Sequence, residues 1–444
     1  MSVRHAEVAE LADAQASGAC GSNIVWVQVP SSALQIGSQF DFLFLRERRN
    51  HMQYRANQKN GDQLSILGYG CLRYTKKGTA IDQEKAEKEM ALAVEKGVNY
   101  FDTAYTYGGS EVCLGKFLAK YGCRDRIKIA TKLPHYYIKK IEDMERYFAE
   151  ELERLQTDYI DYYLMHMLND PATWQRLTDL GIQDWIREKK ESGAIRNIGF
   201  SFHGGTAKFK ELIDAYDWDF CQIQYNYMDE YTQAGIDGLN YAHEKGIPVI
   251  IMEPLRGGRL VNQLPDDARK EFATADKDRT PAEWGLRWIW NHEQVNVILS
   301  GMNDVAQVEE NCRIASEAQA NEMTEADLEV FERVKAAINK SVKVGCTGCG
   351  YCMPCPQGVD IPTCFQAYNR SYTDSWFGGM MAYFMCTTLR RDKTIASKCV
   401  GCGKCEQHCP QQIHIREELK NVKKRMENPV YKVAKVVADK IYRY

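Results

Sequence analysis

The chain has 444 residues and a formal net charge of −3, so no charge excess points to a nucleic acid or an anionic membrane as a partner. No apolar run approaches the roughly 18 residues that a membrane-spanning helix needs. At about 150 residues per domain the length predicts two or three domains, although one barrel can take about 250 residues.

The 16 cysteines are unevenly distributed, because ten of them lie between Cys346 and Cys409. A disulfide-rich secreted protein would be short and would follow a signal peptide. This chain fits neither description. We therefore interpret the cysteine-rich segment as a metal-binding module in a reducing compartment, and we expect a cytoplasmic protein.

Residues 1–51 differ in composition from the rest of the chain. They begin with a stretch rich in Ala, Ser and Gly and later contain the apolar patch Phe40–Leu45. The runs Glu7–Ala14 and Val27–Pro30 resemble a translated transfer-RNA gene. We therefore expect translation to start at Met52 and residues 1–51 to be a non-native or disordered leader.

From Met52 the pattern becomes regular. Asn60-Gly61 between two short strand-like runs predicts a hairpin. Apolar runs then alternate with amphipathic helical segments. The predicted strands are Ile66–Tyr69, Val98–Phe101, Ile127–Ala130, Tyr159–Met165, Ile198–Phe200, Phe220–Gln224, Pro248–Met252 and Val295–Leu299. The predicted helices are Glu84–Glu95, Ile141–Leu155, Asp184–Glu191, Lys208–Asp214, Ile236–His243, Pro281–His292, Val305–Ala315 and a final Glu325–Asn339.

This alternation predicts the fold class. Strands that alternate with helices form a parallel sheet, because parallel neighbours need crossover connections. Eight such units within about 250 residues favour a closed (β/α)8 TIM barrel over an open sheet. We assign residues 52–340 to this α/β barrel, with loops over its mouth at Asn169–Trp174 and Arg256–Arg279.

A glycine pair near the first strand requires a separate interpretation. Gly68-Tyr69-Gly70 resembles the start of a dinucleotide-binding G-x-G-x-x-G sequence, but Arg73 occupies the third glycine position. The acidic residue that such sites place further on is also not evident. We therefore reject a Rossmann interpretation of this segment.

Polar side chains follow the predicted strands where each strand ends. Asp102, Lys132, His166 and Ser201 close the second to fifth strands, and Gln222 lies in the sixth. In barrels of this type the catalytic groups lie at the carboxyl ends of the strands. We therefore expect these side chains to converge on one mouth.

Three segments carry a resemblance to a known family. Residues 99–108, Asn-Tyr-Phe-Asp-Thr-Ala-Tyr-Thr-Tyr-Gly, resemble the aldo/keto reductase signature. Ala130-Thr131-Lys132 and Leu164-Met165-His166 are similar to the next two motifs of that family. The resemblance covers residues 52–320 approximately and implies hydride transfer between a nicotinamide cofactor and a small carbonyl or alcohol substrate.

The resemblance also implies a role for each catalytic residue. Tyr107 would be the general acid, Lys132 its activator, Asp102 the partner of Lys132, and His166 the residue that orients the substrate carbonyl. A free tyrosine titrates near pH 10, and a nearby ammonium is expected to lower that pKa. The histidine would donate a hydrogen bond where negative charge develops on the carbonyl oxygen.

The resemblance further implies cofactor contacts at the nicotinamide end. Ser201 and Gln222 match residues that hold the carboxamide. The usual Asn after that Ser is Phe202 here, and His203 is a candidate to replace its contact. Met252 stands where many relatives stack an aromatic ring on the nicotinamide.

At the adenine end, Glu310-Asn311 matches a pair that binds the base. The positions that usually carry basic groups for the extra phosphate of NADP are Gly301, Met302 and Gln307. Because charge-assisted donors are missing there, the sequence leaves NAD, NADP and a flavin as alternatives.

The cysteine-rich segment contains two regular runs. Each places three cysteines at two-residue intervals and ends in a Cys-Pro pair, which predicts two 4Fe–4S clusters. The runs are Cys346, Cys349, Cys352, Cys355 and Cys399, Cys402, Cys405, Cys409. In two-cluster ferredoxins the fourth cysteine of each run binds the other cluster. We therefore assign Cys409 to the first set of three and Cys355 to the second. Two zinc sites, each formed by a single run, are the alternative.

The 43 residues between the runs have helical character, including Ile361–Tyr368 and Gly379–Leu389. This layout resembles the all-helical ferredoxin domain of respiratory dehydrogenases and heterodisulfide reductases. We assign residues 341–444 to such a domain, with Glu417–Tyr444 as a solvated helical tail that packs back on the barrel or on a partner. Cys364 and Cys386 fall outside both runs and are interpreted as buried thiols.

The two domains together predict an oxidoreductase. Hydride transfer moves two electrons at once whereas a 4Fe–4S cluster passes one, so a bound flavin or a partner flavoprotein would have to link them. A ferredoxin is a further candidate electron partner. Two alternatives remain: a plain carbonyl reductase with structural clusters, and an electron-transfer subunit of a larger complex whose barrel is a scaffold or flavin site.

Overall fold

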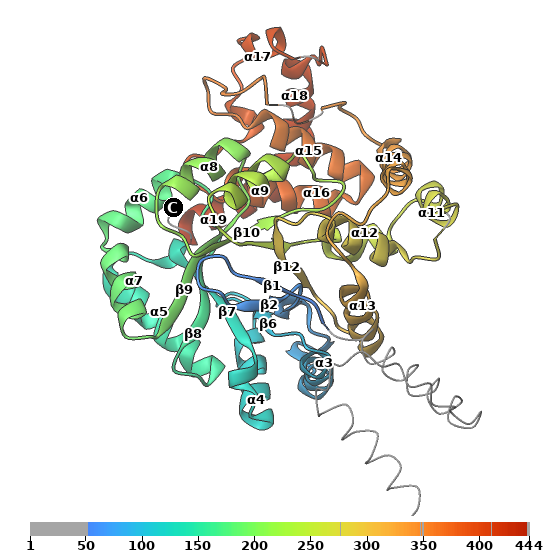
Figure 1. The fold of residues 1–444 in the computed structure, drawn as a ribbon. Helices are drawn as coiled ribbons and strands as arrows, with labels where there is room; N and C mark the ends of the chain where they lie inside the picture. Colours follow the sequence, from blue (N-terminus) through green and yellow to red (C-terminus); the bar gives the residue numbers. More distant parts are fainter. Residues whose placement is uncertain (1–51, 276, 347, 349, 410, 442–444) are drawn as a thin grey trace, which may run out of the picture. The chain divides into compact units, whose positions relative to one another are not determined.

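The computed structural model describes residues 52–275, 277–346, 348, 350–409 and 411–441, which form a barrel and a helical carboxyl-terminal region (Figure 1). The leader predicted for residues 1–51 lies outside the described residues. In the described part of the chain, no helix combines the length and the apolar character needed to cross a lipid bilayer.

The predicted barrel is confirmed. Eight strands pair in parallel with their neighbours, and the last pairs with the first to close the sheet. In chain order they are β3 (Leu67–Gly70), β6 (Tyr100–Asp102), β7 (Lys128–Leu133), β8 (Ile160–Met165), β9 (Ile195–Phe202), β10 (Phe220–Gln224), β11 (Val249–Met252) and β12 (Val295–Ser300). Each contains or overlaps one of the eight predicted runs.

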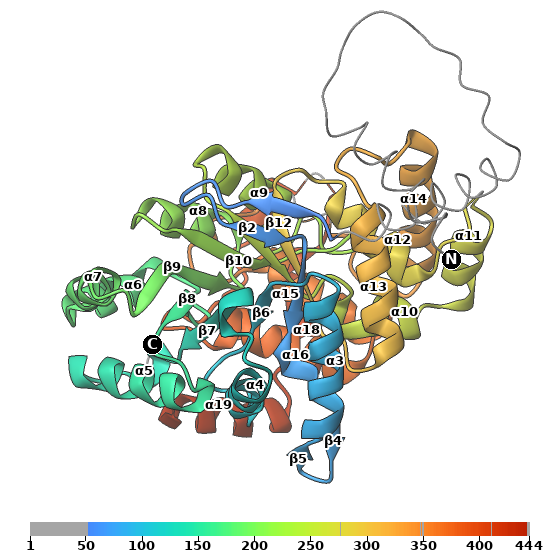
Figure 2. The ribbon, with the colours of Figure 1, turned by 60° about the horizontal axis from the view of Figure 1, so that its bottom comes forward.

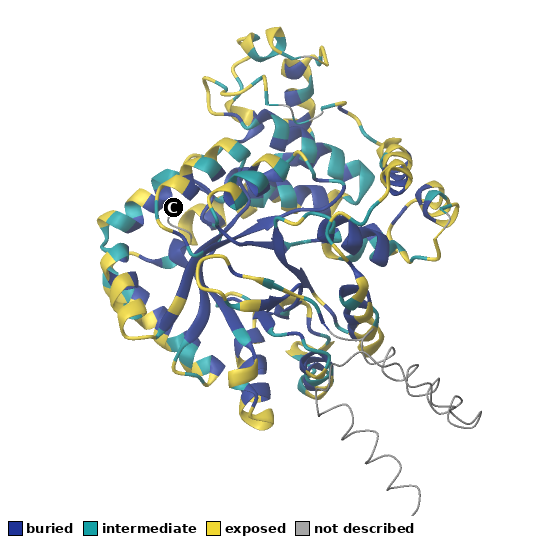
Figure 3. Cartoon of the chain, viewed as in Figure 1, coloured by how far each residue is buried: buried dark blue, intermediate teal, exposed yellow. Residues whose placement is uncertain are grey.

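These strands are buried on both faces, as their nearly continuous apolar sequences require. One cluster of buried side chains, which includes Tyr100, Tyr162, Phe220 and Ile250, packs together separately from the larger core between strands and helices. Figure 3 shows the buried strands surrounded by helices whose outward faces are exposed. The two cores hold the strand ends, and so the side chains that follow them, in fixed positions.

The predicted hairpin is also confirmed. β1 (Tyr54–Ala56) pairs antiparallel with β2 (Gln63–Ser65), and Gly61 adopts a φ of 80° in the turn. The side-chain amide of Asn57 donates to the Tyr162 hydroxyl at 3.1 Å. A second hairpin, β4 (Lys76–Lys77) with β5 (Ala80–Ile81), was not predicted and lies beside α3 (Figure 2).

Helices separate the strands, and all of the predicted barrel helices are found. The helices are α3 (Gln83–Glu95), α4 (Ser110–Tyr121), α5 (Ile141–Leu155), α6 (Pro171–Asp179), α7 (Ile182–Glu191), α8 (Thr206–Asp214), α9 (Gly235–Glu244), α10 (Arg259–Asn262), α11 (Asp266–Ala273), α12 (Pro281–Trp290), α13 (Val305–Glu317) and α14 (Glu325–Asn339). Of these, α4, α6, α10 and α11 were not predicted. Four short 3₁₀ turns accompany them: η1 (Cys71–Arg73), η2 (Arg124–Arg126), η3 (His135–Tyr137) and η4 (Arg256–Gly258).

The two predicted mouth loops need correction. The first contains the start of α6, where the Asp170 side chain accepts from the Thr173 amide and Pro171 occupies the first turn. This is a standard helix start. The second contains α10 and α11. Helix α11 is short and packs against α14, so a distant segment of the chain stabilises it.

The carboxyl-terminal region is helical, as predicted. Its elements are α15 (Ile361–Thr373), α16 (Trp376–Tyr383), the π-helix η5 (Phe384–Thr388), the 3₁₀ turn η6 (Ala396–Lys398), α17 (Lys404–Gln407), α18 (Ile415–Met426) and α19 (Pro429–Ile441). The predicted single solvated tail is wrong. It forms two helices separated before Pro429, and Leu419, Val422 and Tyr431 are buried in the core of this region.

Candidate active site

Four predicted residues meet at the mouth formed by the carboxyl ends of the strands. Asp102 ends β6, Lys132 lies near the end of β7, and His166 follows β8. Tyr107 lies in the connection between β6 and α4. The parallel register places these strand ends side by side, because Asp102 pairs with Ala130 and Lys132 pairs with Leu164.

A buried ion pair forms the base of the site. The Lys132 ammonium lies 2.7 Å from Oδ1 and 2.8 Å from Oδ2 of Asp102, and it also donates to the Thr103 carbonyl at 2.6 Å. The Gln222 amide donates to Oδ2 of Asp102 at 2.9 Å. Charge-assisted bonds of this kind fix the ammonium in one position.

The phenol of Tyr107 lies next to this pair. Lys132 Nζ is 5.1 Å from the centroid of the Tyr107 ring, and the ring centroids of Tyr107 and His166 are 5.9 Å apart. A tight turn holds the tyrosine, since its amide donates to the Ala104 carbonyl and its own carbonyl accepts from Ser110. The three side chains can therefore act on the same small group.

The expected lowering of the tyrosine pKa is not found. Burial, together with the negative charges of Asp102 and Glu253, raises the pKa of Tyr107. The Lys132 charge is largely neutralised by Asp102, with which it forms the ion pair. Tyr107 therefore keeps its proton at neutral pH, as a proton donor must.

His166 is held as a neutral imidazole. Burial and the charge of Lys132 keep the pKa of His166 well below its usual value. The Tyr136 hydroxyl lies 3.1 Å from Nδ1 of His166. If this hydroxyl donates to Nδ1, the ring proton resides on Nε2 and is available to a ligand oxygen. Sequence reasoning missed Tyr136, which lies in η3 rather than at a strand end.

The predicted nicotinamide contacts have partners within the protein. The Ser201 hydroxyl accepts from the Met167 amide at 2.8 Å, and Gln222 donates to Asp102. Both side chains thus support the residues around His166 and Lys132. Met252 ends β11 and is only partly buried, so its thioether can contact a ligand.

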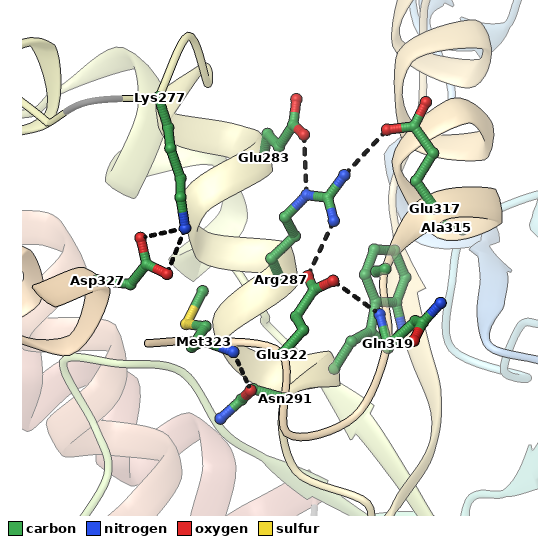
Figure 4. Close-up of polar contacts among 12 residues, drawn as sticks. Lys277, Glu283, Arg287, Asn291, Ala315, Glu317, Gln319, Glu322, Met323 and Asp327 are labelled. Atoms are coloured by element: carbon green, nitrogen blue, oxygen red, sulfur yellow. Dashed lines mark hydrogen bonds and ion pairs between the residues drawn. The ribbon is translucent and has the colours of Figure 1, made fainter. Parts of the chain in front are cut away.

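The predicted adenine pair lies in α13, which follows β12. The Asn311 amide donates to the Ser300 hydroxyl at 3.0 Å, and the Glu310 carboxylate accepts from Thr280 at 2.7 Å. Figure 4 shows how Arg287 of α12 holds this part of the barrel together through Glu283, Glu317 and Glu322. The helix is therefore rigidly attached beside the mouth.

The carboxyl-terminal region contacts the same mouth. The His203 ring lies 3.2 Å from the Gln233 side-chain oxygen, and Gln233 donates to the Cys386 sulfur of η5 at 3.7 Å. Arg390 reaches the His203 carbonyl at 3.5 Å. Cys386 is buried, as predicted, but it contacts the barrel as well as its own domain.

A buried ionic network also joins the two regions. Asp229 of the barrel accepts from Arg256 at 2.5 Å and from Gln366 of α15 at 2.6 Å. Arg256 also lies 3.3 Å from Asp374. Burial alone would raise the pKa of Asp229, but Arg256 holds it well below its usual range. Sequence reasoning missed this network, since no pattern links these positions.

The cysteines are distributed between two places. Cys346, Cys352 and Cys409 line one small cavity whose other walls include Ile361 and Phe365. Cys349 lies outside the described residues. The sulfurs of Cys399 and Cys355 lie close enough to the Cys405 sulfur to interact with it electrostatically. Cys402 of the same run is exposed. The fourth cysteine of each run therefore lies with the other run.

This grouping fits 4Fe–4S clusters better than zinc. A zinc ion needs three or four ligands within a single coordination shell. A cubane of eight atoms keeps its thiolates further apart.

Two family models match the chain. The aldo/keto reductase family model matches residues 66–329, and a 4Fe-4S dicluster domain model matches residues 345–414. Among curated proteins, L-galactose dehydrogenase of Arabidopsis thaliana is 26% identical over 310 residues, which cover 64% of this chain and 94% of that protein. An aldo-keto reductase of Mycolicibacterium vanbaalenii is 29% identical over 272 residues, which cover 60% of this chain and 88% of the relative.

Solved structures agree on the barrel. An aldo-keto reductase of Bacillus halodurans in its holo form has a TM-score of 0.54 and 25% identity, covering 64% of this chain and 96% of its own. One from Klebsiella pneumoniae, described in complex with NADPH, has a TM-score of 0.52 and 21% identity over 64% of this chain and 95% of its own. At 21% identity, the similarity to the Klebsiella pneumoniae structure shows a shared fold.

Proposed function

Because the chain belongs to the aldo/keto reductase family and carries a 4Fe–4S dicluster domain, we propose that it interconverts a small carbonyl compound and its alcohol with NAD(P)H. The observation that carries this proposal is the Lys132–Asp102 pair beside the Tyr107 ring. A reducing compartment, such as the cytoplasm, suits a segment with so many closely spaced cysteines.

The four residues act on the substrate carbonyl in different ways. Tyr107, kept protonated by its raised pKa, gives its proton to the carbonyl oxygen. Neutral His166 donates a hydrogen bond from Nε2 to the same oxygen. Lys132 stabilises the phenolate that remains, because its ammonium lies next to the ring, and Asp102 holds that ammonium in place.

The mouth also fits a nicotinamide. Met252 presents a partly exposed thioether at the end of β11, and thioethers pack well against aromatic rings. Ser201 and Gln222 line the same strand ends, and Glu310 and Asn311 would hold the adenine. A bound nicotinamide would supply the hydride, since no side chain can. The comparisons give no support for a flavin.

Each cluster would be held by one of the two cysteine sets. Cys346, Cys349, Cys352 and Cys409 form the first set, and Cys355, Cys399, Cys402 and Cys405 form the second. Clusters held there would supply one-electron chemistry. A ferredoxin or a flavoprotein is the expected electron partner, and the exposed Cys402 leaves the second set accessible to it.

A second candidate is a plain carbonyl reductase whose clusters are structural. The contacts of Cys386 and Arg390 with the mouth favour it, because the cluster domain then acts as a support for the active site. An electron-transfer subunit with the barrel as scaffold has less support, since an inert scaffold would not need the buried Lys132–Asp102 pair.

Anaerobically purified protein tests these proposals. Iron and sulfide analysis should give about eight of each per chain, as two cubanes require, and a panel of small aldehydes and ketones should be reduced with NADH or NADPH. Bleaching of the cluster absorbance by NAD(P)H would support coupled electron transfer. Stable absorbance during carbonyl turnover would favour the structural role. Undiminished carbonyl reduction by the Tyr107→Phe variant would contradict the catalytic assignment.

A further inference from the structure

Arg73 extends across one sector of the barrel mouth. It ends η1, the turn that follows β3. Its side chain lies against two glycines that have no side chain of their own. A Cβ on Gly301 would stand 3.2 Å from the Cβ and Cδ of Arg73, and one on Gly257 would collide with its Nη2. Both glycines thus leave room for this arginine.

The two glycines show where the arginine runs. Gly301 directly follows β12, and Gly257 lies in η4, which follows β11. The strands β11, β12 and β3 are consecutive neighbours in the barrel. The arginine therefore starts at the end of β3, passes the end of β12 and reaches the turn after β11.

This position lies between the two ends of the proposed dinucleotide site. Met252 at the end of β11 would contact the nicotinamide, and Glu310 with Asn311 in α13 would hold the adenine. A dinucleotide bound in this way crosses the end of β12, where its pyrophosphate joins the two halves. Among the residues that the structure describes, Arg73 forms no ion pair with a carboxylate.

We propose that Arg73 binds the pyrophosphate of the nicotinamide dinucleotide. This inference rests on the proposed function, which places the cofactor at this mouth. A guanidinium presents a rigid fork of N–H donors that matches phosphate oxygens. Its positive charge comes from the turn that follows the first strand of the barrel.

Dinucleotide binding to the resting enzyme tests the assignment without turnover. NADH and NADPH are titrated separately into full-length, cluster-loaded protein, and the change in nicotinamide fluorescence gives each Kd. Arg73→Gln should raise both Kd values about tenfold, the usual range for one charge-assisted bond to a phosphate. Arg73→Lys should show a smaller increase, because it keeps the charge and loses the fork.

Arg126→Gln is the matched control. Arg126 also ends an exposed 3₁₀ turn, η2, but it lies just before the start of β7 at the other end of the barrel. The Arg126→Gln variant should bind NADH and NADPH with the same Kd values as the wild-type protein. Equal Kd values for wild type and Arg73→Gln would overturn the inference, and a loss confined to NADPH would overturn the pyrophosphate assignment. If wild-type protein bound neither dinucleotide, the proposed function itself would fail.

Discussion

The ammonium of Lys132 and the carboxylate of Asp102 are 2.7 Å apart, with 1% and 7% of their side chains exposed. Replacing one partner leaves the other charge buried without compensation, which typically costs about 3–5 kcal/mol. We therefore expect Lys132→Met to lower the free energy of unfolding by that amount and carbonyl reduction by at least ~100-fold. Urea unfolding and steady-state kinetics measure the two effects.

The double variant Lys132→Met/Asp102→Asn separates the two roles of this pair. It removes both charges together, so most of the lost stability should return. The activity should not return, because the phenolate of Tyr107 still lacks its cation. A double variant that regained activity would contradict the proposed role of Lys132.

Tyr107→Phe should lower carbonyl reduction by about 10²–10⁴-fold, the usual contribution of a positioned general acid. Because burial raises the pKa of Tyr107, the phenol should stay protonated through neutral pH. The wild-type kcat should therefore show no decline caused by phenol ionisation below about pH 10. Tyr105→Phe is the control, since Tyr105 donates to Glu150 at 2.6 Å and has no proposed catalytic role.

His135 should make the fold sensitive to acid. Burial and the nearby Arg176 lower the pKa of His135 to about 3, whereas an unfolded histidine titrates near pH 6.5. Between these values the unfolded chain binds the additional proton, so stability should fall as pH decreases from 6.5 towards 3. One such group contributes at most about 1.4 kcal/mol per pH unit. His135→Phe should reduce this slope in urea unfolding at pH 4 to 6, and an unchanged slope would exclude His135 as the source.

Because the fourth cysteine of each run is assigned to the cluster of the other run, replacing it should damage the other run's cluster. Cys409→Ser should disturb the cluster held by Cys346 and Cys352, and Cys355→Ser should disturb the one held by Cys399 and Cys405. Electron paramagnetic resonance of the reduced variants distinguishes the two sites. Cys364→Ala is the control, because this buried thiol donates to the Thr394 carbonyl and belongs to neither cysteine run. Damage to the 399–405 site by Cys409→Ser would show that each run binds its own cluster.

Arg256 should control how the two domains dock. Arg256→Met leaves Asp229 and Asp374 buried without their shared cation, so we expect the unfolding transition to separate into two steps. Differential scanning calorimetry measures this. Arg259→Met is a milder control, because Arg259 lies 3.4 Å from Asp374 and is partly exposed. One unchanged transition in Arg256→Met would show that the network contributes little.

Much of the barrel could be predicted because it follows from local sequence. The strands are apolar runs, and Asp102, Lys132 and His166 lie at or near the ends of those runs. Tyr107 lies between β6 and α4, and only the resemblance of residues 99–108 to the family signature pointed to it. The pKa direction of Tyr107 could not be predicted in this way, because spacing reveals a neighbouring lysine and not the depth of burial. The role of Gln222 was also hidden, since its partner Asp102 is 120 residues away and becomes adjacent only when the barrel closes.

Helix α4 and helix α11 were missed for different reasons. α4 begins at Ser110, two residues after the signature segment, and no helix was predicted between Phe101 and Ile127. α11 has only eight residues, too few to be stable alone, and it depends on α14 for its buried face. The tail helices α18 and α19 were predicted as helical, but their burial depends on partners in the cluster domain.

The shared buried network around Asp229 has a practical consequence for anyone dividing this protein into fragments. Residue 340 marks a boundary along the sequence, yet Gln366 and Asp374 beyond it share hydrogen bonds with Asp229 and Arg256 before it. A truncated barrel would expose this polar surface and lose the support that Cys386 and Arg390 give to the His203 loop. Expression trials, crystallisation and swaps with single-domain relatives should therefore keep both regions on one polypeptide.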